Sequence, residues 1–182
     1  MDIFAHAFWT HAIHRSTAIQ KKFNLTKKEI WLVIFFGIAP DLFSFGIFFV
    51  ERIYRWLFRS SEFFLSGAPD PSSIPHYVYN AYNYTHSLVI FLLFFCIIWL
   101  LRKKAPWLIF GWGLHILIDI FSHSTDFFAT PFLFPLSDVK INGVSWGHPV
   151  FMVINYSSII LIYLIFYLFK KSRYAKNTNY QK

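Results

Sequence analysis

Four long apolar runs divide the chain, and short clusters of basic residues separate them. The runs cover approximately residues 30–50, 87–101, 107–122 and 151–169. A helix needs roughly 20 apolar residues to cross a bilayer, so each run is long enough, or nearly so, to span. A fifth segment, 2–20, is less apolar, but no charged residue lies between Asp2 and Arg15. We expect this segment to span as well, the alternative being an amphipathic helix in the membrane interface.

The predicted fold class is all-α, a polytopic membrane bundle of four to five spans. Asn142-Gly143 lies between short stretches that contain alternating apolar residues, a pattern that favours a type I′ turn and predicts a small extracytoplasmic β-hairpin. We expect residues 1–170 to form one membrane-embedded helical domain, followed by a disordered basic cytoplasmic tail at 171–182.

Composition supports a membrane protein. Hydrophobic residues make up 56% of the chain and charged residues 14%, against about 25% charged in soluble domains. The 24 phenylalanines exceed what the interior of so small a soluble domain can bury. The net charge of +8 comes from clusters between apolar runs, which set topology and do not predict a nucleic-acid partner. Cys96, in an apolar run, is the single cysteine and forms no intrachain disulfide.

The basic residues predict the orientation in the cell (inner) membrane. With five spans, thirteen of the seventeen Lys and Arg residues fall on one side, in segments 15–28, 102–104 and 170–182. Because cytoplasmic loops are enriched in basic residues, this side is predicted to be cytoplasmic. The N-terminus is then outside, the C-terminus is cytoplasmic, and two long outer loops cover about 51–84 and 124–149.

The most chemically distinctive segment contains His115, Asp119 and His123, each four residues apart among apolar neighbours. On an α-helix this spacing places all three on one face, with a drift of about 40° per step. Imidazole and carboxylate groups are zinc ligands, and ionisable groups in so apolar a helix are costly unless they are paired or metal-bound. Simple pairing of His115 with Asp119, one turn away, is the alternative.

Three more ionisable residues fall in the middle-to-outer half of the same predicted bundle. Asp41 lies about halfway along the second predicted span, directly after Pro40, which has no N–H and therefore kinks or breaks a helix. Broken backbone at membrane depth is tolerated where it lines a cavity. His86 opens the third predicted span and His6 lies near the outer end of the first.

Together these residues predict a divalent metal site, most simply for zinc. One ion, or two ions bridged by a carboxylate, would satisfy this ligand set. The predicted metal ligands are His6, Asp41, His86, His115, Asp119 and His123, of which Asp41 and Asp119 are also the predicted catalytic groups. His11 and His14 are predicted to be pairing or packing residues, and His148 lies in an outer loop.

The order of short motifs resembles the YdjM-type family of membrane-bound metal-dependent hydrolases. The motifs are an early His6, Pro40-Asp41, Thr85-His86-Ser87-Leu88 and Gly111-x-x-x-His115-x-x-x-Asp119, followed by the proline-rich segment 131–135. The resemblance implies an all-helical fold distantly similar to zinc-dependent phospholipase C. It implies metal-ligand roles for His6, Asp41, His86, His115 and Asp119, whereas the role of His123 depends on its spacing alone.

The predicted function is hydrolysis of an ester or phosphodiester in a lipid or lipid-linked substrate near the outer leaflet. One alternative is a non-enzymatic membrane protein with a structural metal or a buried His/Asp network. A transporter or proton relay is a second alternative, but the candidate ligands cluster in one half of the bundle. Haem ligation by histidines from two helices is a third, and an absorbance spectrum would detect it.

Overall fold

The computed structural model describes residues 1–16, 26–59 and 70–179. This part of the chain contains six α-helices, two single-turn 3₁₀ helices and no β-strand. The α-helices are α1 (Ile3–Arg15), α3 (Lys27–Arg59), α4 (His76–Thr85), α5 (Leu88–Arg102), α6 (Phe110–Ser122) and α7 (Pro149–Asn179). The 3₁₀ helices are η2 (Pro71–Ser73) and η3 (Trp107–Ile109).

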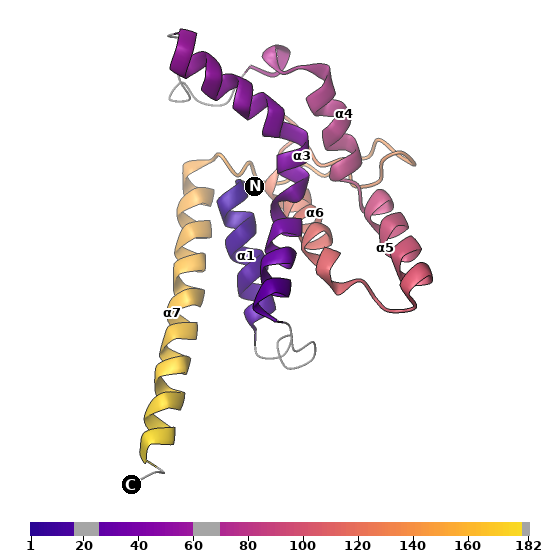
Figure 1. Ribbon diagram of the computed structural model, residues 1–182. Coiled ribbons are helices and arrows are strands. Elements are labelled where there is room, and N and C mark those ends of the chain that lie inside the picture. Colours follow the sequence, from indigo (N-terminus) through magenta and orange to yellow (C-terminus); the bar gives the residue numbers. More distant parts are fainter. Residues whose placement is uncertain (17–25, 60–69, 180–182) are drawn as a thin grey trace.

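Helix α3 is the centre of the bundle and packs against α1, α4 and α6. Its 33 residues correspond to about 50 Å of helix, and it changes direction along its length (Figure 1). Pro40 lies inside α3 and cannot donate to the carbonyl of Phe36, which is a common cause of a kink. Asp41 follows this proline, so the sequence places a carboxylate where the helical ladder is interrupted.

Helices α3 and α6 approach each other closely at Gly111. A Cβ atom added to Gly111 would lie 2.1 Å from the carbonyl oxygen of Val33 and 2.8 Å from the amide nitrogen of Gly37. Only glycine permits two helix backbones to come this near. One turn later α6 presents His115, so this close contact fixes the distance between α6 and the part of α3 that carries Asp41.

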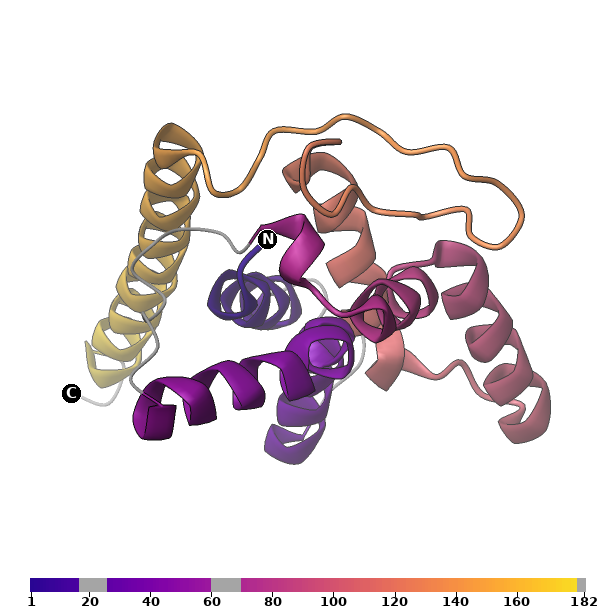
Figure 2. The ribbon, with the colours of Figure 1, turned by 90° about the horizontal axis from the view of Figure 1, so that it is seen from above.

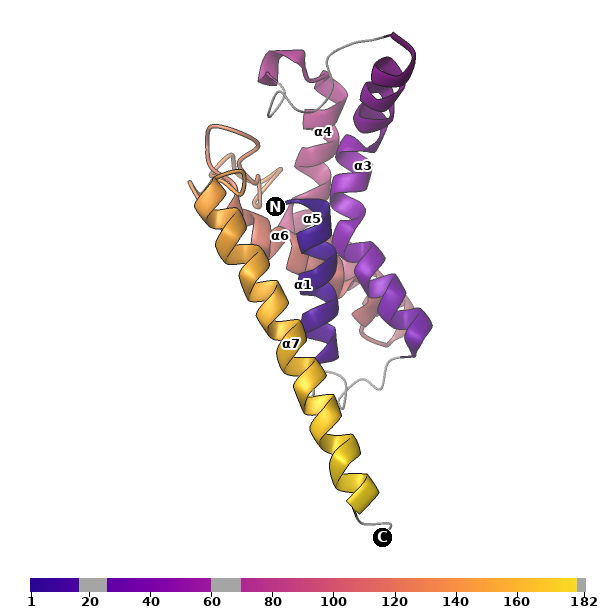
Figure 3. The ribbon, with the colours of Figure 1, turned by 90° about the vertical axis from the view of Figure 1, so that its left-hand side faces the viewer.

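Helix α7 lies at the edge of the bundle and packs on α1, as Figures 1 and 3 show from two sides. Polar contacts join α7 to α1 and its N-cap: Trp9 Nε1 donates to Asn155 Oδ1 at 2.8 Å, and the Tyr156 hydroxyl donates to the capping Asp2 Oδ1 at 2.9 Å. The Tyr163 hydroxyl adds contacts to His11 Nδ1 and to the Phe8 carbonyl. Ten large hydrophobic residues between positions 150 and 169 of α7 are exposed. In a membrane these side chains face lipid.

The number of candidate spans is smaller than predicted. Within residues 1–16, 26–59 and 70–179, two helices are long and apolar enough to cross a membrane, Lys27–Phe58 and Pro149–Lys171, and α4 with α5 forms a third only if the pair, bent by 54°, is one span. The predicted run at 107–122 becomes η3 and the 13-residue α6, and the segment at 2–20 becomes the 13-residue α1. Helices of 13 residues reach about 20 Å, less than the roughly 30 Å hydrocarbon core. The prediction of four to five spans was therefore wrong for the described part of the chain, because α1 and α6 are too short to cross the hydrocarbon core.

The predicted β-hairpin was also wrong. The Asn142-Gly143 segment docks on the C-terminal end of α6 instead: the amide nitrogens of Gly143, Val144 and Trp146 donate to the carbonyls of His123, Phe121 and Ser122, each at 2.9 Å. The last carbonyls of a helix lack intrahelical donors, so this segment satisfies them. A Cβ at Gly143 would lie 2.4 Å from the Phe121 carbonyl oxygen, which explains the need for glycine there.

The segment that joins α6 to α7 runs across one side of the bundle when it is viewed from above (Figure 2). Lys21, Lys22 and Lys182, which entered the topology prediction, lie outside the described residues, as do positions 60–69 of the first outer loop. The orientation of the termini and the domain boundary after residue 170 remain predictions.

Candidate metal centre

The six predicted ligands come together at one place in the bundle. They originate from four helices: α1 contributes His6, α3 contributes Asp41, His86 follows the last residue of α4, α6 contributes His115 and Asp119, and His123 follows the last residue of α6. Asp119 is the centre of the group, and its two carboxylate oxygens face different sets of partners. The two sets are called here the Oδ2 side and the Oδ1 side.

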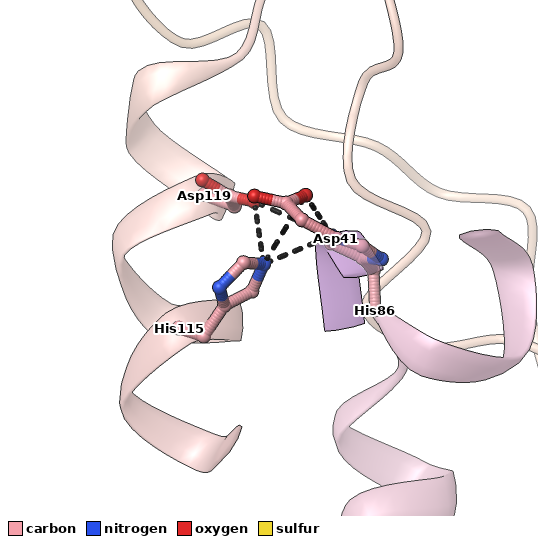
Figure 4. A group of neighbouring side chains, drawn as sticks. All are labelled: Asp41, His86, His115 and Asp119. Carbon is pink, nitrogen blue, oxygen red and sulfur yellow. Dashed lines mark hydrogen bonds and ion pairs between the residues drawn. The ribbon is translucent and has the colours of Figure 1, made fainter. Parts of the chain in front are cut away.

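The Oδ2 side consists of Asp41, His86 and His115 around Asp119 Oδ2 (Figure 4). The Nε2 atoms of His115 and His86 lie 3.1 and 3.5 Å from Asp119 Oδ2 and 3.0 Å from each other. Asp41 Oδ1 lies 3.5 Å from His86 Nε2 and 3.8 Å from His115 Nε2. One donor atom from each of the four residues falls within 4.8 Å of the others. This buried cluster can hold a metal ion.

The hydrogen bond between His115 Nδ1 and a backbone carbonyl determines the tautomer of the His115 ring. His115 Nδ1 lies 2.8 Å from the carbonyl oxygen of Gly37. A carbonyl only accepts, so Nδ1 carries the proton and donates it. In the neutral ring Nε2 then presents a lone pair toward His86 and Asp119. Gly37 lies three residues before Pro40, in the part of α3 where the proline interrupts the ladder.

Asp119 Oδ2 has no hydrogen-bond partner among the residues that the structure describes, although it is buried. The two imidazole nitrogens nearest to it are Nε2 of His115 and Nε2 of His86. Lone pairs and carboxylate oxygens that converge without a proton between them repel one another, and a cation relieves this repulsion. The donor set, two imidazole nitrogens and two carboxylates, fits zinc and related divalent ions.

The Oδ1 side is formed by His6 and His123. His6 Nε2 lies 3.0 Å and His123 Nε2 lies 3.5 Å from Asp119 Oδ1. The α-amino nitrogen of Met1 contacts the same oxygen and lies 2.7 Å from His123 Nε2. Unlike the histidines of the Oδ2 side, His6 and His123 have Nδ1 atoms without a hydrogen-bond partner among the described residues.

The exposed fractions of the six side chains indicate where solvent or a ligand can reach the cluster. The side chains of His6, His86, His115 and Asp119 are 0% exposed, whereas Asp41 and His123 are 10% and 8% exposed. Any path to the cluster therefore leads past Asp41 or His123. The next residues on α3, Leu42 and Phe43, are exposed and apolar, so the face of α3 that is turned away from the cluster at this level is suited to lipid.

Two aromatic contacts hold the imidazole rings. The ring of His6 stacks on that of His115 with centroids 3.7 Å apart, and Tyr82 stacks on His86 at the same distance. The Tyr82 hydroxyl donates to the carbonyl oxygen of Phe128 at 2.8 Å, which joins α4 to the segment after α6. The sequence prediction did not include Tyr82, and its spacing of four residues from His86, one helical turn, was the signal that would have identified it.

The remaining histidines lie apart from the cluster. His14 Nδ1 donates to the carbonyl of Thr10 at 2.9 Å, and His11 Nδ1 lies 2.5 Å from the Tyr163 hydroxyl on α7. His148 is exposed and its carbonyl accepts from Met152 in the first turn of α7. His11 and His14 thus have the pairing contacts that were predicted for them.

Comparison with known proteins gives one match. The model of the YdjM inner membrane protein family matches residues 1–179. The chain therefore belongs to this family. No curated protein and no solved structure matches the chain.

Proposed function

We propose that this member of the YdjM inner membrane protein family is a metal-dependent hydrolase. The proposed metal is a divalent ion, with zinc favoured by the imidazole and carboxylate donors. The proposed ligands on the Oδ2 side are Asp41, His86, His115 and Asp119. The proposed substrate is an ester or phosphodiester of a lipid or lipid-linked molecule.

The observation that carries the proposal is the hydrogen bond from His115 Nδ1 to the Gly37 carbonyl. It leaves Nε2 of the neutral ring unprotonated beside a buried carboxylate oxygen that accepts no hydrogen bond among the described residues. Histidine ligands commonly donate their second nitrogen to a carbonyl in this way, which fixes the ring for metal binding.

A second, weaker ion is proposed on the Oδ1 side, where it would replace the Met1 α-amino group beside Asp119 Oδ1 and His123 Nε2. His6 and His123 direct Nε2 toward Oδ1 while His86 and His115 direct Nε2 toward Oδ2. A carboxylate that bridges two ions is a common arrangement in hydrolases with paired metals. In this proposal His6 and His123 are ligands of the second ion and Asp119 is shared.

A bound divalent ion would act as a Lewis acid on the phosphoryl or carbonyl oxygen of the ester. The chain contributes positioning and proton transfer. Asp41 is the more exposed of the two carboxylates, so we assign it the role of accepting the proton of the attacking water. Asp119, fully buried and central, holds the histidines of both sides in place.

The lipid nature of the proposed substrate follows from the surroundings of the site. The polar cluster lies among apolar helices, and α3 carries exposed apolar side chains, among them Leu42 and Phe43, on the faces turned away from the cluster. A lipid substrate shares the membrane with these apolar surfaces, whereas a water-soluble substrate gains nothing from them. The outer leaflet is proposed because it agrees with the predicted orientation of the chain.

The test is hydrolysis of phospholipids and fluorogenic phosphodiester or carboxylic ester lipids by the purified protein in nanodiscs. We expect activity that a strong chelator abolishes and Zn²⁺ restores, and that Asp41→Asn reduces by at least about 100-fold, as for loss of a general base. Thr10→Val is the matched control, because Thr10 is buried and its hydroxyl has no partner among the described residues. Equal activity of Asp41→Asn and the wild type would contradict the proposal.

One observation favours a second candidate, a non-enzymatic protein with a buried His/Asp network. Each Nε2 atom of His86 and His115 lies within ion-pair distance of both carboxylates, so two protonated imidazoles would also balance Asp41 and Asp119. In that case the purified protein binds no metal at stoichiometric level, and Asp41→Asn lowers its thermal stability without affecting any hydrolysis.

A further inference from the structure

A chain of hydroxyl groups connects His86 to the interrupted part of α3. His86 Nδ1 lies 2.9 Å from Thr85 Oγ1, and Thr85 Oγ1 lies 2.7 Å from Ser44 Oγ. Ser44 Oγ in turn donates to the carbonyl oxygen of Pro40 at 2.8 Å. Pro40 immediately precedes Asp41, so the chain joins two proposed ligands that are far apart in the sequence.

The donors and acceptors in this chain run in one direction. The Pro40 carbonyl only accepts, so Ser44 donates its proton there. Thr85 has one hydroxyl proton, and three oxygens besides the His86 ring lie near it: Ser44 Oγ at 2.7 Å, the Ala81 carbonyl at 2.9 Å and the Tyr82 carbonyl at 3.4 Å. A proton given to any of these leaves Thr85 Oγ1 as an acceptor toward His86.

His86 Nδ1 is then the donor to Thr85, and the neutral His86 ring presents its Nε2 lone pair to Asp41, His115 and Asp119. This is the tautomer that a metal requires at Nε2. The Gly37 carbonyl fixes the same tautomer in His115. The Nε2 atoms of His86 and His115 lie 3.0 Å apart. The tautomer of each ring is thus fixed by a separate contact, to a carbonyl for His115 and to a hydroxyl for His86.

Thr85 is also attached to α6. Trp112 Nε1 donates to the Thr85 carbonyl at 2.6 Å, so the same residue contacts α3 through its hydroxyl and α6 through its backbone. Both contacts keep the end of α4, where His86 lies, in register with the helices that carry Asp41, His115 and Asp119. Within the hydroxyl chain, Ser44 is 1% exposed and Thr85 is half-buried.

We propose that Thr85, assisted by Ser44, is a positioning residue that holds His86 as the Nδ1–H tautomer and so raises the metal affinity of the Oδ2 side. This inference rests on the proposed metal site. Loss of such a supporting contact typically costs about 10- to 100-fold in metal affinity. The hydroxyl, and not the bulk of the side chain, is the part of Thr85 that performs this role.

The experiment compares Thr85→Val, which keeps the shape and removes the hydroxyl, with Thr85→Ser, which keeps the hydroxyl. Zn²⁺ affinity is measured by chelator competition on the purified protein. We expect Thr85→Val to bind about 10- to 100-fold more weakly and Thr85→Ser to bind like the wild type. Thr10→Val, the same change at a buried threonine whose hydroxyl has no described partner, is expected to have no effect.

Nitrogen-15 NMR of histidine-labelled, metal-free protein gives a readout that does not depend on metal. We expect the wild-type His86 ring to be protonated at Nδ1 and this preference to be lost in Thr85→Val. A wild-type ring protonated at Nε2, or a Thr85→Ser variant as weak as Thr85→Val, would overturn the proposal. If the wild-type His86 ring is protonated at Nδ1 but the protein does not bind Zn²⁺, the proposed function is contradicted. The role of the hydroxyl chain in fixing the His86 tautomer would then still stand.

Discussion

The two sides of Asp119 have similar donor atoms but different support. On the Oδ2 side, His115 donates to the Gly37 carbonyl and His86 lies against the Thr85 hydroxyl. On the Oδ1 side, the Nδ1 atoms of His6 and His123 have no partner within the described parts of the chain. His123 also follows the end of α6, whereas His115 lies inside that helix.

Residue types alone therefore do not predict which of two candidate sites binds a metal ion more tightly. An imidazole held through its second nitrogen is already oriented before the ion arrives, and an imidazole without that contact loses conformational freedom on binding. The Oδ2 side should therefore bind first and tightly, and the Oδ1 side second and weakly.

The largest effect is expected from removing one histidine on each side. His86→Ala should abolish the tight class of Zn²⁺ sites in a titration. It removes a ligand whose ring stacks on Tyr82 and whose Nδ1 atom contacts the Thr85 hydroxyl. His123→Ala should remove only the weak class and leave the tight one at wild-type affinity. Loss of the tight class in both variants would mean that the two sides are one site.

A smaller but still substantial effect is expected where α6 meets α3. Gly111→Ala places a methyl group against the Val33 carbonyl and forces the two helices apart, at a cost of about 1–3 kcal/mol for overpacking. The Oδ2 side spans these helices, so its Zn²⁺ affinity should fall together with the thermal stability. Gly46→Ala is the control, because a Cβ there meets nothing within 4 Å. Unchanged metal affinity in Gly111→Ala would show that the spacing of α3 and α6 does not matter to the site.

Gly143→Ala is expected to act on the Oδ1 side. The added methyl group would collide with the carbonyls of Phe121 and His123 and displace the segment that caps α6. Overpacking of this kind costs about 1–3 kcal/mol of stability, which thermal unfolding in detergent would measure. Binding to the weak class of sites should decline while the tight class persists. Gly147→Ala should behave like the wild type, because an added Cβ would lie 3.8 Å from its nearest neighbour, Ser145 Oγ, which is ordinary van der Waals contact.

The smallest effect is expected for Tyr82→Phe. The substitution keeps the ring stacked on His86 and removes only the hydrogen bond to the Phe128 carbonyl. Such a bond contributes about 1 kcal/mol to stability, and Zn²⁺ affinity should not change. A marked fall in affinity would mean that the hydroxyl, and not the stacked ring, positions His86.

The residues of the candidate site were predictable because each was anomalous in its own segment. Asp41 after a proline and Asp119 among apolar residues both stand out without knowledge of their neighbours. The supporting atoms were not predictable: the carbonyl of Gly37 and the hydroxyl of Ser44 acquire their roles only through the packing of α3 against α6 and α4.

The errors in the fold have the same origin. Apolar composition does not show where a helix begins and ends, so the run at 107–122 was predicted to span although it forms η3 and a 13-residue α6. Asn142-Gly143 has the composition of a hairpin turn, but the unsatisfied carbonyls at the end of α6 provide better partners for that segment than a second strand does. Both outcomes depend on tertiary contacts that a local pattern does not contain.

The central claim is that Asp119 and its neighbours form a metal centre, and elemental analysis of the purified protein tests it most directly. Wild-type protein and His115→Ala would be purified side by side without added chelator, and their metal content compared by mass spectrometry. We predict at least one divalent ion per wild-type chain and a loss of that ion in His115→Ala. Wild-type protein without stoichiometric metal, or His115→Ala with undiminished metal, would contradict the claim.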